Sequence, residues 1–210
     1  MTQLEVLIDG ITEGQRIPEE FAFGIRTEKV PFAFGANISP EIRWSAGPAG
    51  TKSYAIIMHD RSVPTVFDDA NQEGKTIPAD LARMDFIHWV LVDIPTTITS
   101  LPKGAESESV VPKGKPTGPG AYGTRGANDF GMFMAGNSDM AGNYGGYDGP
   151  APPWNDELIH EYVFTVYALD VKSLGLEEVF SGADTRAAID GHVLANGNVV
   201  GTYTLNSGLL

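Results

Sequence analysis

Apolar residues along this chain fall into short runs that alternate with stretches rich in glycine, proline and polar residues. The runs are rich in β-branched and aromatic side chains, which favour strands over helices. Five of them are predicted to be strands: Leu4–Ile8, Ser53–Met58, Phe86–Ile94, Tyr162–Leu169 and Val199–Leu205. The regular alternation of strands and helices that a parallel α/β sheet requires is missing. We therefore expect a mostly antiparallel, all-β fold of the sandwich or barrel type, with a few peripheral helices.

One helix is predicted near the C-terminus. Asp184 is a suitable N-cap, Ile189 and Val193 lie four residues apart on one helical face, and Asn196-Gly197 is a stop signal. A further short helical turn is predicted over Leu174–Phe180.

Two long segments look like insertions between the predicted strands. Thr65–Met84 is expected to form a loop with a short helix, and Lys113–Gly149 is a longer, glycine-rich loop. Long loops inside a compact domain usually carry function or are mobile. Strand signals lie on both sides of each segment, so residues 1–210 are predicted to form a single domain.

Charge and composition narrow the classes of partner. The net charge is -13, from 27 acidic and 14 basic side chains, so the basic surface that nucleic-acid binding requires is not expected. The chain has no cysteine, which excludes disulfides and thiol chemistry. It begins with no signal-peptide pattern and has no run of about 20 apolar residues. We therefore expect a cytoplasmic protein without stable membrane insertion.

The candidate chemistry lies at the ends of predicted strands. His88 interrupts one apolar run, His160 precedes another, and Asp60 ends a third. Imidazoles titrate near neutral pH, and a nearby carboxylate favours their charged form, so the three residues together predict an anion site. The alternative is that each histidine is simply hydrogen-bonded in the core. By strand alternation His59 is expected to face away from such a site, and His192 is expected to be structural.

Several segments resemble one known family in the correct order. Asn37–Trp44 (NISPEIRW) is similar to N-x-S-P-x-L-x-W, and Pro48–Ala55 is similar to P-A-G-T-x-S-x-A/V. His59–Pro64 (HDRSVP) resembles D-P-D-A-P, and His88–Pro95 (HWVLVDIP) resembles H-W-V-V-x-N-I-P.

The later part of the chain continues the resemblance. Asn128–Gly131 reads NDFG, and Gly145–Pro153 (GGYDGPAPP) is similar to G-Y-x-G-P-x-P-P. His160–Leu169 (HEYVFTVYAL) resembles H-R-Y-x-F-x-V-Y-A-L, and Gly191–Ala195 and Val200–Tyr203 also fit. These motifs resemble the phosphatidylethanolamine-binding protein family, and most of all its prokaryotic Raf-kinase-inhibitor-like subfamily.

The resemblance implies an antiparallel β-sandwich with an anion pocket, no catalytic residues, no metal and no cofactor. By analogy it also implies a homodimer. The ligand it implies is an inorganic anion or a small phosphorylated group, which we expect between His88 and His160 and to bind more weakly above neutral pH. The residues that it assigns to the pocket and its wall are Asp60, His88, His160, Tyr162, Gly149 and Pro150.

The chain departs from the family pattern beside the expected site. Ser62 stands where the D-P-D-A-P motif has its second acid, and Arg61 replaces its first proline. Glu161 replaces the arginine that follows the late histidine. These changes leave ethanolamine selectivity open, and they suggest that Arg61 adds positive charge near the anion.

Two alternative functions remain open. Asp60, His88 and His160 match a two-histidine, one-carboxylate metal site, which would suit a metal-dependent enzyme. The glycine-rich segment 113–149 and neighbouring aromatics instead suit a protein-interaction module that modulates a kinase or a protease. The aromatics expected to be exposed there are Phe133, Tyr144 and Trp154.

Overall fold

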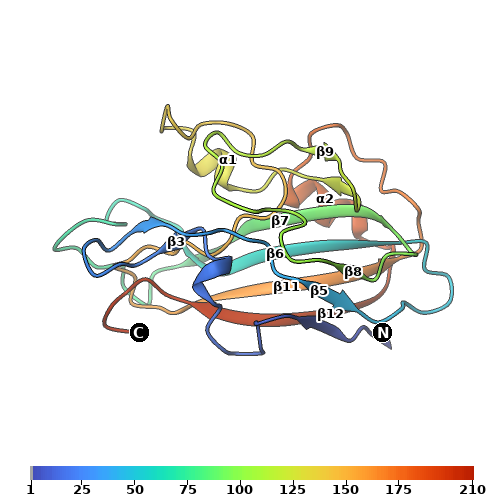
Figure 1. The fold of residues 1–210 in the computed structure, drawn as a ribbon, viewed down its shortest axis with the longest axis horizontal. Helices are drawn as coiled ribbons and strands as arrows, with labels where there is room; N and C mark the ends of the chain where they lie inside the picture. Colours follow the sequence, from blue (N-terminus) through green and yellow to red (C-terminus); the bar gives the residue numbers. More distant parts are fainter. Residues whose placement is uncertain (1) are drawn as a thin grey trace.

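The computed structural model describes residues 2–210, and its centre is a seven-stranded sheet (Figure 1). Neighbouring strands run antiparallel, except that β1 runs parallel to β12. In spatial order the strands are β1 (Thr2–Gln3), β12 (Val193–Tyr203), β11 (His160–Leu169), β6 (Ser53–Pro64), β7 (Arg83–Pro95), β10 (Thr124–Arg125) and β9 (Gly118–Pro119).

A smaller sheet covers one face of the large one and makes the fold a sandwich. It contains β2 (Val6–Ile8), β5 (Ile42–Trp44) and β8 (Ser100–Leu101). Trp44 packs with Trp89 and Leu91 in the main core between the sheets. A two-stranded ribbon of β3 (Gly24–Ile25) and β4 (Ala33–Phe34) lies apart from both sheets.

Helices are short and lie at the periphery. The helix α2 (Gly182–Ile189) covers the other face of the large sheet, where Ile189 clusters with Val90 and Ile57. Ser181 caps α2 through a reciprocal pair of hydrogen bonds with Asp184. The two remaining helical segments are η1 (Glu19–Phe21) and α1 (Phe130–Phe133). Both faces of the central strands are therefore buried, which explains their nearly continuous apolar runs.

The predicted fold class is confirmed, and each predicted run contains a strand. The central strands β6, β7 and β11 are longer than predicted, whereas β2 covers only Val6–Ile8 of the run Leu4–Ile8. β12 begins before the predicted Val199 and ends at Tyr203, before the predicted Leu205. The C-terminal helix is shorter than predicted, because it ends at Ile189 and β12 begins at Val193. Gly191, at φ 78°, turns the chain between them. The helical turn expected over Leu174–Phe180 is wrong, since these residues are irregular, with a bend at residues 178–179. No helix forms within the described segment Thr65–Met84 either.

Candidate ligand-binding site

A cavity of about 500 Å³ lies where three central strands of the large sheet meet the long segments. Its volume falls within the roughly 300–1,000 Å³ of typical small-molecule sites. Val63 comes from β6, Phe86 and His88 from β7, and Tyr162 from β11. The rest of the lining is Phe23, Phe32, Phe34, Phe67, Ala70, Asn71, Phe130, Phe133, Met134, Asn137, Met140, Ala151, Pro152, Pro153 and Trp154.

A β-bulge brings His88 to the cavity. The register between β6 and β7 shifts, so that Met58 lies opposite Trp89 but His59 lies opposite Ile87. His88 is thus an extra residue on β7, and a bulge of this kind re-aims the side chains beside it. Trp89 packs in the main core together with Tyr162, whereas Ile87 packs on the opposite face of the sheet. The bulge therefore determines that the His88 side chain points into the cavity.

His88 is buried, with 3% of its surface exposed, and is held on three sides. Its Nδ1 lies 2.8 Å from the carbonyl oxygen of Asp148. The rings of Tyr162 and Phe130 meet it edge-on at 5.2 and 5.3 Å. Burial lowers the pKa of His88 below its usual value, against the opposing effect of Asp60. A neutral ring that donates from Nδ1 to the carbonyl leaves Nε2 as an acceptor for a ligand.

Tyr162 supplies the second polar group of the cavity. Its hydroxyl is fully buried and has no hydrogen-bond partner of normal geometry among residues 2–210. Burial and the nearby Asp60 carboxylate hold the pKa of Tyr162 well above its usual value, so the group keeps its proton. A buried hydroxyl without a partner costs about 1–3 kcal/mol of stability, so its presence in a native structure needs an explanation, and a bound ligand is one.

His160 and Asp60 lie behind the cavity and do not line it. Nδ1 of His160 is 2.6 Å from Asp60, and Nε2 is 3.1 Å from Asp156. Asp156 in turn pairs with Arg83 at 2.5 Å, which completes a buried row of alternating charges. Both nitrogens of His160 are therefore already used by carboxylates. The structure does not bring this ring beside His88 as a second donor to a ligand.

Asp60 connects this charged row to the backbone. One of its oxygens faces His160, and the other accepts from the amide of Ser62 at 2.8 Å. Asp60 also lies directly opposite Tyr162 in the register of β6 and β11. It therefore orients His160 and sets the electrostatic surroundings of Tyr162.

A second buried network fixes the loop that carries Asp148, whose carbonyl holds His88. The Asp148 carboxylate is completely buried and accepts from Lys115 at 2.6 Å, from Asn37 at 2.8 Å and from Asn128 at 2.9 Å. Asn37 has a left-handed backbone at φ 53°, which asparagine tolerates better than most residues. The N-x-S-P and N-D-F-G motifs lie far apart in sequence, yet Asn37 of the first and Asn128 of the second both donate to the Asp148 carboxylate.

Gly149 and Pro150 belong to the support of the cavity rather than to its surface. The Gly149 amide donates to the Asn37 side chain at 2.8 Å, so this donor is already used within the protein. A Cβ at Gly149 would lie 1.8 Å from the Phe21 carbonyl oxygen, which requires glycine there. The Pro150 carbonyl accepts from Gly24 at 3.0 Å.

The residues that depart from the family motifs do not face the cavity. Arg61 pairs with Glu161 at 2.6 Å, with both side chains about half exposed, so it adds no positive charge to the lining. The Ser62 hydroxyl accepts from the Glu161 amide at 3.1 Å. His59 faces Asp85 and His192 faces Asp170, and neither lines the cavity.

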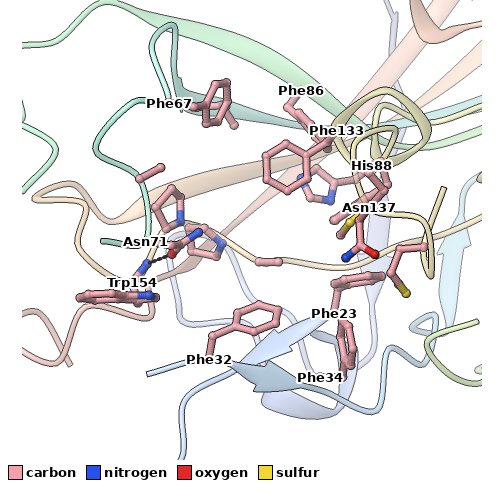
Figure 2. A pocket seen from close by; sticks show the side chains of 18 of the residues that line it. Phe23, Phe32, Phe34, Phe67, Asn71, Phe86, His88, Phe133, Asn137 and Trp154 are labelled. Atoms are coloured by element: carbon pink, nitrogen blue, oxygen red, sulfur yellow. Dashed lines mark hydrogen bonds between the residues drawn. The ribbon is translucent and has the colours of Figure 1, made fainter. Parts of the chain in front are cut away.

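The aromatic wall is the part of the site that sequence reasoning missed. Tyr144, expected to be exposed, is buried, and its hydroxyl donates to the Met140 carbonyl at 2.8 Å. Phe133 is half exposed at 50%, and Trp154 is partly buried. Figure 2 shows Phe67, Phe86 and Phe133 on one side of the cavity, and Phe23, Phe32 and Phe34 on the other. The sequence signal for this wall is the presence of aromatic residues, such as Phe67 and Phe133, in the otherwise polar segments 65–84 and 113–149.

Two kinds of site are missing from the part of the chain that the structure describes: a metal site and a membrane-spanning helix. Among residues 2–210, no group of three or more His, Cys, Asp or Glu side chains is placed to hold a metal ion. The geometry therefore does not favour the metal site formed by Asp60, His88 and His160. Within the same described part of the chain, no helix has the length and apolar character needed to cross a membrane.

Comparison with known proteins agrees with the fold and the motifs. A model of the family described as phosphatidylethanolamine-binding protein matches residues 8–204. A UPF0098 protein of Aquifex aeolicus is 31% identical over 204 residues, which are 95% of this chain and 88% of that protein. The UPF0098 protein YbhB of Escherichia coli is 28% identical over 202 residues, covering 96% of this chain and all of its own.

Solved structures show the same fold. The putative phosphatidylethanolamine-binding protein homologue CT736 of Chlamydia trachomatis superposes with a TM-score of 0.63 at 25% identity, covering 97% of this chain and 98% of its own. YbcL of Escherichia coli, titled a new member of the mammalian family, gives a TM-score of 0.67 at 24% identity over 97% of this chain and 99% of its own. The chain belongs to the phosphatidylethanolamine-binding protein family.

Proposed function

We propose that this protein binds a small anion, phosphate or a phosphorylated group, at the polar end of the cavity between His88 and Tyr162. The observation that carries the proposal is the contact between His88 and Tyr162, whose rings meet edge-on at 5.2 Å in the cavity lining. The buried Tyr162 hydroxyl adds to it, because it has no partner of normal geometry among the described residues. The proposal is binding without turnover, and it assigns Asp60, His160, Gly149 and Pro150 to holding the two contact residues in place.

The protonation of His88 defines how the anion is held. A phosphate monoanion donates a hydrogen bond to the neutral Nε2 and accepts one from the Tyr162 hydroxyl. A phosphate dianion bound to an imidazolium is the same arrangement with the shared proton on Nε2. Either way the complex holds one proton between ligand and ring. Because the pKa of His88 is lowered and phosphomonoesters lose their second proton near pH 6, this proton must be taken up from solvent at higher pH. The affinity should therefore fall above neutral pH.

Tyr162→Phe tests the proposal with little risk to the fold. The change removes only the unpartnered hydroxyl, so the free energy of unfolding should stay the same or rise. The affinity for inorganic phosphate should fall about tenfold, because one charge-assisted hydrogen bond is lost. Isothermal titration calorimetry between about pH 5.5 and 8 measures both this loss and the decline with pH.

Leu7→Ala is a suitable control, because Leu7 is 54% exposed and does not line the cavity. It should bind phosphate like the wild type. If Tyr162→Phe also binds phosphate like the wild type, the anion does not lie between His88 and Tyr162.

A further inference from the structure

The cavity is far larger and more apolar than a bare anion requires. Apart from His88, its lining contains no ionisable side chain other than the neutral Tyr162. Seven phenylalanines line it, and the two asparagines, Asn71 and Asn137, are exposed. Tyr162 and His88 lie at one end of the cavity. Most of its volume of about 500 Å³ is therefore lined by side chains that form no hydrogen bonds with water.

The apolar wall includes residues of both long segments, which meet over the cavity. Phe67, in segment 65–84, and Phe133, in α1, lie with ring centroids 5.8 Å apart at an angle of 57° (Figure 2). Phe133 also meets Phe86 of β7 edge-on at 6.2 Å. The two segments thus place these rings beside Phe86 and across the cavity from Phe23, Phe32 and Phe34 (Figure 2). Phe67 and Phe133 are together called the aromatic roof.

Both segments are held by polar contacts that are at least partly buried. The Asn155 side chain donates to the carbonyl oxygens of Asp69 and Lys75 at 2.8 and 3.0 Å, and it accepts from the Asn71 amide at 2.9 Å. Asp129, directly before α1, accepts from the Ile87 amide at 2.7 Å and so joins the other segment to β7. The aromatic roof is therefore a built part of the cavity, and it is shaped before any ligand enters.

Because the cavity lining has no positively charged side chain to pair with a phosphate, contacts with the aromatic roof matter for the affinity of a ligand. No lysine or arginine lines the cavity, and the whole chain carries a net charge of -13. A bare phosphate there gains only the contacts of His88 and Tyr162. An apolar group on the same ligand adds burial against the phenylalanines, which scales with the apolar area removed from water.

We infer that the ligand is a phosphomonoester with a flat apolar body, its phosphate between His88 and Tyr162 and its body under Phe67 and Phe133. The inference rests on the proposed function, and it adds the chemical class of the ligand. The geometry of the roof favours a ring system, because aromatic pairs prefer stacked or edge-on contacts.

Titration with 1-naphthyl phosphate, inorganic phosphate and 1-naphthol tests the inference. The naphthyl ester should bind at least about tenfold more tightly than inorganic phosphate, since it buries apolar area that phosphate lacks. It should also bind more tightly than 1-naphthol, which lacks the phosphate. In Phe133→Ala, the ratio of the affinities for the ester and for inorganic phosphate should fall about fivefold.

Met132→Ala is the matched control. Met132 is the neighbour of Phe133 in α1, is 77% exposed and does not line the cavity. Its affinity ratio should equal that of the wild type. Because Phe133 is half exposed, Phe133→Ala should remain folded, which circular dichroism verifies.

The outcomes separate this inference from the proposed function. Equal affinity for the ester and inorganic phosphate, with weaker binding of both by Tyr162→Phe, overturns the inference and leaves the proposed function standing. Equal affinity for the ester and 1-naphthol overturns both, because the phosphate then contributes nothing. Failure of all three probes to bind at millimolar concentration also overturns both.

Discussion

His88 and His160 carry the same side chain on nearby strands of one sheet, yet their surroundings set opposite protonation states. Burial lowers the pKa of His88, whose only hydrogen-bond partner among residues 2–210 is the Asp148 carbonyl. Burial also acts on His160, but the carboxylates of Asp60 and Asp156 outweigh it and raise the pKa to about 9. One ring is thus neutral in the lining of the cavity, and the other is a charged part of the scaffold.

The charge on His160 should make stability depend on pH. The folded pKa of His160 is about 9 against a usual value of 6.5, so its contribution is fully present below about pH 6.5 and is lost as the pH rises through 9. The lost contribution should be on the order of 3 kcal/mol. Urea unfolding at pH 6, 7.5 and 9.5 measures it.

The variant His160→Gln should be less stable and should lack this part of the pH dependence, because an amide does not titrate. His192→Gln, at an exposed ion pair with Asp170, is the control and should keep the wild-type profile. An unchanged slope in His160→Gln would assign the pH dependence to other groups.

At the scale of elements, the site depends on how the loop over Gly149 meets the strands. The loop places the Asp148 carbonyl against His88 and its carboxylate among Asn37, Asn128 and Lys115. Removing one partner of such a buried group leaves a charge unpaired, which costs more than the pair itself contributes. The loop is therefore held as a rigid unit, which keeps the His88 tautomer fixed.

Gly149→Ala should disrupt this element. The added Cβ would lie 1.8 Å from the Phe21 carbonyl oxygen, and backbone atoms cannot move aside as a flexible side chain can. The free energy of unfolding should fall by more than about 3 kcal/mol, as for other severe steric clashes in a core. Gly136→Ala, where nothing lies within 4 Å of the new Cβ, should change stability little. Comparable urea midpoints for the two variants would contradict the prediction.

At the scale of the whole molecule, the net charge of -13 opposes the entry of any anion. The cavity contains no lysine or arginine that would reverse this field locally. The homodimer expected from the family resemblance stays a prediction, and sedimentation equilibrium would measure it.

Salt should therefore strengthen the binding of an anionic probe. Raising the ionic strength from about 20 to 200 mM shortens the screening length and weakens the long-range repulsion, so the affinity for 1-naphthyl phosphate should rise about twofold. Sodium chloride and sodium gluconate should act alike, because the effect depends on ionic strength. A fall in affinity with both salts would mean that local positive charge dominates the site.

The sequence by itself determined the strands, because runs of β-branched and aromatic residues bounded by glycine and proline are local properties. It also pointed to His88 and Tyr162 through ordered motifs. It failed at the C-terminal helix, where Val193 continues a helical spacing but pairs with Leu169 in the sheet. Strand pairing there outweighs local periodicity.

Only the tertiary structure decided which titratable groups line the cavity. The bulge at His88 depends on the register between two strands, and Asp156 and Arg83 come from separate segments to enclose His160. The aromatic roof likewise forms only where Phe67 and Phe133 meet. These features depend on contacts between residues distant in sequence, which no local pattern encodes. They place one of the two expected histidines in the cavity lining and the other in a buried row of charges.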